Sequence, residues 1–322
     1  MARLELVPFS DEYLADAARL LAARHARHRE VEPLLSTRFE DPADARKELE
    51  RVSRLDGASG AAALREGRLV GYLVGARRSD ALWGNNIWIE APGHAAEDPE
   101  DVRDLYGLMA GRWVDEGRTR HSVLVPAWDR ELLDAWFRLS FGQQHAHGVR
   151  KLTELKEVTL PDGFAIRSPD PDEIEDLIDI DLALPDHQRR SPVFGSPQPY
   201  TREDSRKEWL ATLADGDEKI LVGAYRGQAV ACWAIVPTER SSENRALLVP
   251  ERSCFLGFAA TLPEFRGSGI GVALTRAGFA WAAEAGYPAM TTDWRVTNLL
   301  SSRFWPKRGF RTSFLRLYRS IP

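Results

Sequence analysis

The sequence has few cysteines, no long apolar run and no apolar leader at its start. Only two of its 322 residues are cysteine, Cys232 and Cys254, and both lie in apolar, strand-like runs. So small a number excludes a disulfide framework and favours buried free thiols in a reducing compartment. No apolar segment approaches the roughly 18 residues of a membrane-spanning helix, and residues 1–9 lack the apolar core of a signal peptide. We therefore expect a cytoplasmic protein.

The chain also lacks an excess of positive charge. It contains 43 lysines and arginines against 48 acidic residues, which gives a net charge of -5 and a pI near 5.9. This balance argues against general nucleic-acid binding, which needs a clustered basic surface. No Lys-Ser/Thr pair follows the glycine-rich segment at 266–271, so the chain has no Walker A loop there. His145-x-His147 alternates on one strand face and could suit a metal, but a strand with two half-buried or exposed histidines is the favoured interpretation. We therefore expect no metal site.

The overall composition is that of an ordinary globular protein, and the length and an internal repeat indicate two halves. A hydrophobic fraction of 43% suffices for packed cores, and the length suggests roughly two domains of about 150 residues. A faint internal repeat supports this division. Residues 67–71 align with 227–231 at an offset of 160, and Gly117, Trp136 and Phe141 align with Gly286, Trp305 and Phe310 at an offset of 169.

Strand and helix signals alternate in the same order in both halves. We predict an α/β protein of two domains, 1–152 and 153–322, each with a central twisted mixed sheet flanked by helices. In the second half the pattern predicts helices at 172–181, 201–214, 269–285 and 298–308, and strands at 164–167, 219–225, 229–236, 255–261, 289–294 and 311–318.

The stretch 255–276 predicts a phosphate-binding turn. An apolar strand ends before Pro263, the glycine-rich segment 266–271 follows, and a helix then begins. Glycines allow backbone N–H groups to converge on an anion, and the positive end of the helix dipole adds to the attraction. An ordinary strand-to-helix loop is the alternative for such a turn when it stands alone.

Here the chain resembles the GNAT family, the Gcn5-related N-acetyltransferases. Arg266-x-x-Gly269-x-Gly271 matches the family's (Q/R)-x-x-G-x-(G/A) signature. Downstream, Asn298, Ser301, Trp305 and Gly309-Phe310 occupy the spacing of its N-x-x-A-x-x-x-Y…GF segment. The resemblance is strong over residues 163–322 and rests on the repeat order over residues 1–150. Together the halves look like a tandem GNAT protein with one intact and one degenerate half.

The resemblance implies that the intact half binds acetyl-CoA or another acyl-CoA as co-substrate. Its pyrophosphate would lie on the turn, its pantetheine arm along a strand that splays from its neighbour, and Asn298 would contact the arm. The cofactor-binding residues expected from the resemblance are Ala259, Ala260, Thr261, Arg266, Gly267, Ser268, Gly269, Ile270, Gly271, Val272, Asn298 and Trp305.

The sequence departs from the family where catalysis is expected. Trp305 stands where the family often has an acidic tyrosine, and an indole N–H is no acid, so Ser301, Ser302 or a water remains as proton donor. No carboxylate occupies residues 254–260, where the family often has a glutamate base. Glu239, Glu251, Asp293 and His187 remain as candidates. For the acceptor we expect contacts from His187, Asp293 and Trp294, although each of these positions equally suits a structural role.

The degenerate half carries acids where the other half has its phosphate turn. At the offset of 169, residues 266–271 align with Glu97-Asp98-Pro99-Glu100-Asp101-Val102. Carboxylates would repel a pyrophosphate, and Pro99 removes a backbone donor. We therefore predict one cofactor site per chain, in the second half.

Two functions fit these observations, beside a third interpretation in which the acceptor is a hydroxyl or an antibiotic-like aminoglycoside. The first is an N-acetyltransferase that moves an acetyl or other acyl group from its CoA ester to an amine of a small molecule or protein by direct attack in a ternary complex. The second is a non-catalytic acetyl-CoA-binding regulator. The expected protein is a monomer or homodimer with no nucleic-acid or membrane partner. The acceptor loops, near 187–200 and 238–252, do not reveal the acceptor.

Overall fold

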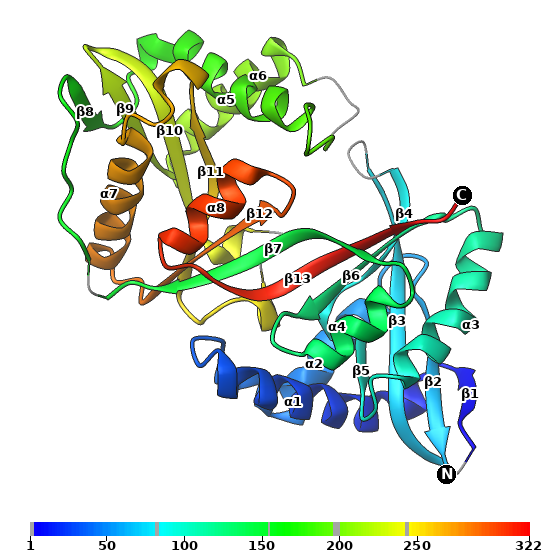
Figure 1. Cartoon of the computed structure of the whole chain (residues 1–322). Helices are drawn as coiled ribbons and strands as arrows, with labels where there is room; N and C mark the ends of the chain where they lie inside the picture. The colour runs from blue at the N-terminus through cyan, green and yellow to red at the C-terminus, as the bar shows by residue number, and fades with distance from the viewer. Residues whose placement is uncertain (1–2, 81–83, 154, 196–199, 242–244) are drawn as a thin grey trace. The chain divides into compact units, whose positions relative to one another are not determined.

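The computed structural model describes residues 3–80, 84–153, 155–195, 200–241 and 245–322 (Figure 1). By its internal contacts the chain forms two units, and each is described by itself. The first unit comprises residues 1–147, 246–248 and 312–322, and the second comprises residues 148–245 and 249–311. In the described part of the chain, no helix is both long and apolar enough to cross a bilayer.

The first unit is built on a mixed sheet in the order β1-β2-β3-β4-β6-β13-β7, with β5 paired to β3. Strands β4 and β6 run parallel, whereas β1 to β4 are joined antiparallel. Its elements are β1 (Glu5–Pro8), α1 (Leu14–Val31), α2 (Pro42–Ser53), β2 (Ser59–Arg65), β3 (Arg68–Asp80), β4 (Gly84–Ile89), β5 (His94–Ala96), α3 (Asp101–Asp115), β6 (Arg120–Pro126), α4 (Arg130–Phe137), β7 (Gly142–Lys151), whose last residues fall in the second unit, and β13 (Arg311–Ser320).

The second unit repeats this plan with the strand order β12-β11-β10-β9-β8. Strands β8 to β11 are antiparallel and β12 is parallel to β11. Its elements are β8 (Phe164–Arg167), α5 (Ile174–Gln188), α6 (Arg202–Asp215), β9 (Lys219–Tyr225), β10 (Gln228–Pro237), β11 (Ser253–Thr261), α7 (Ile270–Glu284), β12 (Ala289–Arg295) and α8 (Leu299–Lys307).

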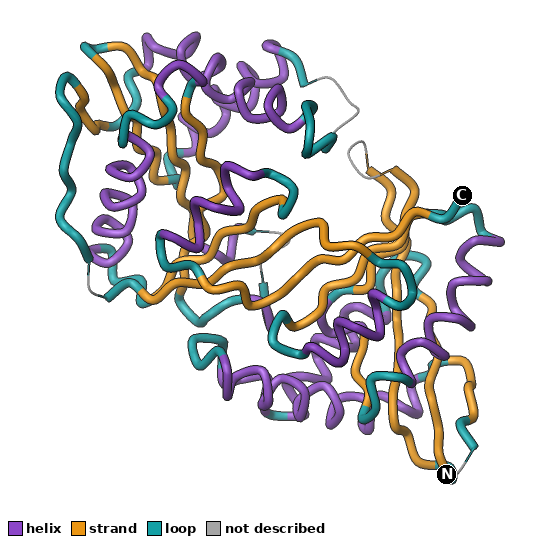
Figure 2. Tube along the Cα trace, viewed as in Figure 1, coloured by secondary structure: helices purple, strands orange, loops and turns teal. Residues whose placement is uncertain are grey.

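Helices cover both faces of the second unit's sheet (Figure 2). Successive strand side chains point to opposite faces. Ile220 and Val222 therefore pack with Trp209 of α6 and the apolar side of α5. Gly223 faces α7 instead, where a Cβ atom would lie 2.7 Å from Ile270. The absence of a side chain at this position thus lets the first turn of α7 rest directly on the sheet.

Four details differ from the expectations drawn from sequence. Helix α5 runs to Gln188, seven residues beyond the predicted end, because Pro185 is accommodated within it. Strand β5 was not expected. Ser10 donates to Glu12 instead of capping a helix. The last strand, β13, pairs antiparallel with β6, from Phe314–Pro126 to Ser320–Arg120. Residues 312–322 therefore belong with the first unit, whereas the predicted division assigned them to the second.

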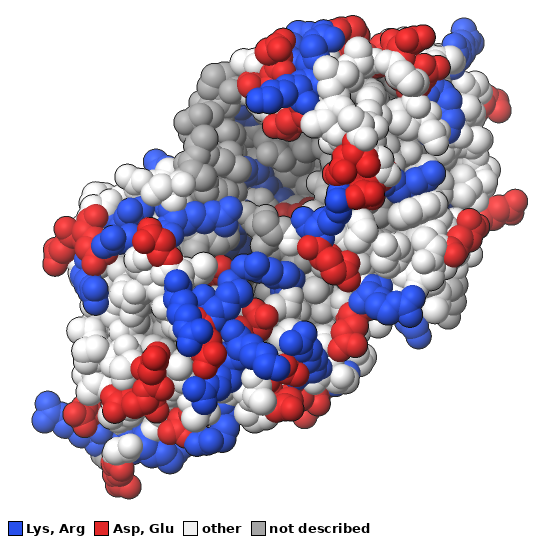
Figure 3. All heavy atoms as spheres, turned by 180° about the vertical axis from the view of Figure 1, so that it is seen from behind, with Lys and Arg blue, Asp and Glu red and all other residues white. Residues whose placement is uncertain are grey.

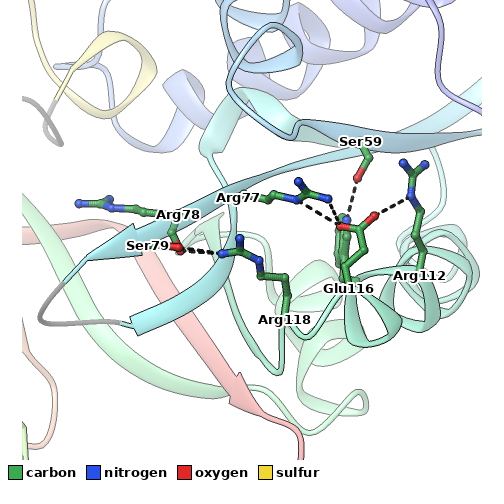
Figure 4. Close-up of polar contacts among 8 residues, drawn as sticks. Ser59, Arg77, Arg78, Ser79, Arg112, Glu116 and Arg118 are labelled. Atoms are coloured by element: carbon green, nitrogen blue, oxygen red, sulfur yellow. Dashed lines mark hydrogen bonds and ion pairs between the residues drawn. The ribbon is translucent and has the colours of Figure 1, made fainter.

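A polar network holds the end of α3 against β3 (Figure 4). Glu116 pairs with Arg77 at 2.9 Å and with Arg112 at 3.1 Å. Buried Trp113 donates its indole N–H to the Ser59 hydroxyl at 2.8 Å. Exposed ion pairs contribute little stability, so the buried tryptophan is the main anchor. On the face shown in Figure 3, positive and negative side chains are interspersed over the surface.

Candidate functional site

Strand β11 leaves its parallel neighbour halfway along its length. The two strands pair from Ser253–Ala289 to Leu256–Thr292, and β11 then continues to Thr261 without β12. Its other edge stays paired to β10 as far as Thr261. The last residues of β11 therefore present a row of backbone groups to a gap in the sheet, where an extended ligand can pair with them.

The glycine loop, residues 262–269, joins β11 to α7 and turns its backbone toward this gap. Gly267 and Gly269 have φ values of +80° and +96°, in the left-handed region that favours glycine. Within the described chain, the N–H groups of Gly267, Gly269 and Gly271 make no hydrogen bond. Three unpaired donors at a helix N-terminus form an anion cradle.

A pocket of about 390 Å³ opens beside this loop; we call it the loop pocket. Its apolar wall comes from Leu184, Trp233, Phe265, Leu300, Phe304 and Trp305, and its polar side chains are Thr261, His187, Asn298, Ser301, Arg266 and Arg308. Trp233 is 4% exposed, and its buried indole N–H has no partner in the described structure. A buried unpaired donor is costly unless a ligand or water accepts from it.

The charge around the loop pocket is positive. Burial and the nearby Arg190 lower the pKa of Arg266, although Glu264 opposes them. Burial and the nearby Arg276 likewise lower the pKa of Arg308. No described carboxylate forms an ion pair with Arg266, Arg276 or Arg308, whereas Arg65, Arg68 and Arg138 of the first unit each pair with a carboxylate. Uncompensated guanidinium groups of this kind attract phosphate.

Comparison with known proteins identifies the fold around this site. Residues 182–310 match the family model described as "Acetyltransferase (GNAT) family". This match lies almost entirely within the second unit, which is therefore similar to a GNAT domain. A search of curated protein sequences gives no match.

Solved structures extend the GNAT likeness of the fold to the whole chain. A GCN5-related N-acetyltransferase from Sphaerobacter thermophilus superposes with a TM-score of 0.60 at 12% identity, over 99% of this chain and 96% of its own. A tandem GNAT protein from the clavulanic acid biosynthesis pathway gives a TM-score of 0.52 at 14% identity, over 99% and 98%. A fungal glucosamine N-acetyltransferase region gives 0.55 at 15%, over 99% of this chain and 38% of that one. The mixed α/β fold with two tandem GNAT-like domains is confirmed.

The wall of the loop pocket contains most of the cofactor-binding residues expected from the GNAT signature. These are Ala259, Ala260, Thr261, Arg266, Gly267, Gly269, Gly271, Val272, Asn298 and Trp305. Ser268 and Ile270 are not part of the wall. The Ile270 side chain is fully buried toward Gly223, and its N–H lies 3.4 Å from the Ser268 hydroxyl. Their contact with a cofactor stays a prediction.

The candidates for chemistry separate into two groups. His187 and Ser301 line the loop pocket, whereas Ser302 does not. Glu239 lies in the 3-10 helix Thr238–Arg240, at the end of β10 far from the glycine loop. Asp293 is also outside the wall, and Trp294 packs against Gly148. Their proposed roles remain untested, but the structure brings only His187 and Ser301 to this pocket.

Sequence reasoning missed part of the pocket wall. Leu184 was not expected there and reaches the wall because α5 extends beyond the predicted helix, which ended at residue 181. The same extension places the expected His187 on a helix. Trp233 reaches it because its strand position pairs with Ala259. Both residues lie in predicted strands, at 229–236 and 255–261, but the sequence did not indicate their pairing. In the described residues, no group of three or more His, Cys, Asp or Glu is placed to hold a metal.

The first unit has the same strand–loop–helix plan without an open anion cradle. Four residues (97–100) separate β5 from α3, against eight (262–269) between β11 and α7. Glu97 and Glu100 of this shorter loop, and Asp101 directly after it, are paired with arginines of the unit. Asp101 binds Arg65 through both carboxylate oxygens at 2.6 and 2.7 Å, Glu97 pairs with Arg68, and Glu100 pairs with Arg138.

Side chains fill the gap beside β5. Arg24 of α1 is 3% exposed and donates to the carbonyl oxygens of Ala91, at 2.7 Å, and His94. His94 is fully buried and its Nε2 lies 2.8 Å from the Leu124 carbonyl oxygen. Burial lowers the pKa of His94 to about 3. In the first unit, side chains of the chain itself therefore provide the hydrogen-bond donors and fill the space that a ligand would otherwise occupy.

Proposed function

We propose that the chain is an acyl-CoA-dependent N-acyltransferase with one cofactor site, in the second unit. The observation that carries this proposal is the anion cradle of Gly267, Gly269 and Gly271 beside the open edge of β11. The cradle suits the pyrophosphate of acetyl-CoA, and the open strand edge suits the amides of its pantetheine arm. Arg266 and Arg308 supply positive charge at the same pocket.

The pocket's polar side chains are the groups that the protein itself contributes to the acyl transfer. Bound acetyl-CoA supplies an acyl thioester: the acceptor nitrogen forms the new C–N bond as the C–S bond breaks, the nitrogen loses one proton and the sulfur gains one. In this proposal His187 takes up the first proton, and the Ser301 hydroxyl or a water provides the second. The support for these roles is that both side chains line the pocket. Trp305, with no acidic proton, serves as apolar wall. The acceptor is an amine of a small molecule or a protein.

Titration calorimetry with acetyl-CoA tests the cofactor site. We expect one molecule bound per chain. Gly269→Asp places a carboxylate in the cradle and should weaken binding at least 100-fold, about 2.7 kcal/mol. Gly227→Asp is the matched control, because Gly227 has the same φ of +96° but lies in a hairpin turn with open space around it. Equal affinity of the Gly269→Asp and Gly227→Asp proteins would refute the anion cradle.

Thiol release from acetyl-CoA with a panel of amines tests the reaction. Acceptor-dependent release, lost in Gly269→Asp, is the expected result. One specific observation favours the alternative of an acetyl-CoA-binding regulator: the pocket wall carries no tyrosine and no carboxylate. Stoichiometric binding without turnover of any amine would establish the regulator and exclude the transferase.

A further inference from the structure

His187 lies where the loop pocket meets a second hollow. It belongs to the last turn of α5 and is partly exposed. The second hollow, of about 350 Å³, lies between α5, α6 and the start of the glycine loop. His187 and Arg266 line both spaces. A side chain at this junction can touch a group that enters from the second hollow toward a ligand in the loop pocket.

Asn298 determines which nitrogen of His187 carries the proton. The Asn298 side chain caps α8: its Oδ1 accepts from the backbone N–H of Leu300, at 3.1 Å, and of Ser301, at 3.4 Å. Backbone N–H groups only donate, so the atom that faces the helix must be the amide oxygen. The same oxygen lies 3.1 Å from Nε2 of His187. An amide oxygen only accepts, so Nε2 must carry a hydrogen.

A neutral imidazole has one N–H, and Nδ1 of His187 is then left with a free lone pair. Nδ1 makes no hydrogen bond within the described chain. The Nδ2 group of Asn298 is likewise unused there, so it stays available to the cofactor arm. A cap that satisfies one helix terminus thus also orients a proton acceptor.

We propose that Asn298 is a positioning residue that holds His187 in the Nε2–H form, so that Nδ1 accepts the proton of the acceptor amine. This inference rests on the proposed function. The neutral acceptor amine forms the C–N bond through its own lone pair, its nitrogen gives one proton to Nδ1, and the imidazole becomes an imidazolium with two N–H groups. The C–S bond breaks and the sulfur gains its proton from the Ser301 hydroxyl or a water. The second hollow is then the path of the acceptor.

The charged groups around the imidazole come from three elements. Asp179, Asp186 and Arg190 lie on or directly after α5, Arg202 lies on α6 and Arg266 lies in the glycine loop. Asp179 pairs with Arg202, and Asp186 pairs with Arg189. Arg190 and Arg266 have no carboxylate partner among the described residues. The variants used below leave all of these groups unchanged.

Nitrogen NMR of the histidine side chains in the full chain tests the positioning step without a cofactor. At neutral pH we expect His187, assigned by comparison with His187→Gln, to show a protonated Nε2 and an unprotonated Nδ1. Asn298→Ser keeps a capping hydroxyl but is too short to reach the ring, so it should yield a mixture of both tautomers. An Nδ1–H form in the parent protein, or no change in Asn298→Ser, would overturn the proposal.

The acceptor that gives thiol release provides the second readout, at saturating acetyl-CoA. We expect His187→Gln to lower kcat at least 100-fold and Asn298→Ser about tenfold. Asn298→Asp keeps both the cap and the contact, and its carboxylate favours the imidazolium. It should therefore move the acid limb of the pH–rate profile to higher pH without abolishing turnover. Unchanged kcat in His187→Gln would reject the base. Absence of turnover with every amine would reject the proposed function and this base together, while the NMR result would still decide the tautomer.

Discussion

Each unit has a gap in its sheet, beside β5 in the first unit and beside the end of β11 in the second. Side chains fill the first gap, whereas the second is open. Helices α1 and α5 align at the repeat offset of 160, so Arg24 corresponds to Leu184. His94 pairs with Leu73 and Ala259 pairs with Trp233, and because Leu73 and Trp233 are related by the same offset, His94 corresponds to Ala259. In the first unit a guanidinium and an imidazole fill the gap. In the second, a leucine methyl group and an alanine leave room for a ligand.

If the first unit binds no cofactor, as we propose, this difference explains how it is stable without one. A splayed strand exposes backbone carbonyls that need donors. Arg24 satisfies two of them from within the chain, while Glu97, Glu100 and Asp101 are paired with Arg68, Arg138 and Arg65. Filling and pairing suit a unit that serves as scaffold. The open unit keeps unpaired amides and guanidinium groups, which are the features that a phosphate ligand requires.

The largest expected effect is that of acid, which should destabilise the first unit more than the second because the buried histidines lie in the first unit. Burial lowers the pKa values of His25 and His121 to about 4, and those of His28 and His94 to about 3. Below about pH 6.5 the unfolded chain binds protons that the folded unit cannot bind. Each histidine then costs up to about 1.4 kcal/mol per pH unit, on the order of 8 kcal/mol for the four at pH 5.

Peptide-resolved hydrogen exchange, corrected for its intrinsic pH dependence, measures this effect. First-unit peptides should lose protection between pH 6.5 and 5, before those of the second unit. The control His187→Gln, which removes the second unit's partly exposed histidine, should leave the midpoint unchanged. Earlier loss of protection in the second unit would contradict this assignment.

Removing the internal guanidinium should destabilise the first unit without opening a second cofactor site. Arg24→Ala leaves the Ala91 and His94 carbonyls without their donor, which should cost about 3 kcal/mol. Denaturant unfolding of the full chain gives the loss, and Arg27→Ala, an exposed arginine on the same helix, is the control. Acetyl-CoA stoichiometry should stay at one because the paired acids remain. Two sites in Arg24→Ala would show that the side chain alone blocks binding.

Moving the guanidinium to the other unit should close the open pocket. Leu184→Arg places at the loop pocket the residue found at the corresponding position of the first unit. We expect acetyl-CoA to bind at least tenfold more weakly, about 1.4 kcal/mol, while Leu184→Met retains affinity. Calorimetry on both variants tests this. Undiminished affinity in Leu184→Arg would mean that residue 184 does not decide between the filled and the open state.

The helix caps provide the smallest difference between the units. Asp129, which aligns with Asn298 at the offset of 169, accepts from the Leu132 N–H at 3.0 Å and caps α4. Asp129→Ala should cost about 1 kcal/mol of stability, with Asp129→Ser close to the parent. Neither should alter acetyl-CoA affinity. A change in cofactor binding in Asp129→Ala would indicate that this cap affects more than its own helix.

Local patterns predicted much of the fold. The apolar pattern predicted β8 and β9 with their observed bounds. The internal repeat predicted that hairpins and helices occur in the same order in both halves. The glycine loop was predicted because left-handed backbone at Gly267 and Gly269 has a strong residue preference. The end of α5 was not predicted, because Pro185 reads as a helix terminator when no tertiary contact is considered. His187 was therefore expected in a loop and lies on a helix.

The sequence by itself determined the duplicated α/β plan, the single glycine loop and the acids that replace it in the first half, since all three follow from residue type and spacing along the chain. Only the tertiary structure decided that β13 pairs with β6, that Arg24 fills the first unit's gap, and that Asn298 contacts His187 across 111 positions of sequence. Strand pairing and burial join residues that are distant in the chain, and no local period encodes which distant partner a residue meets.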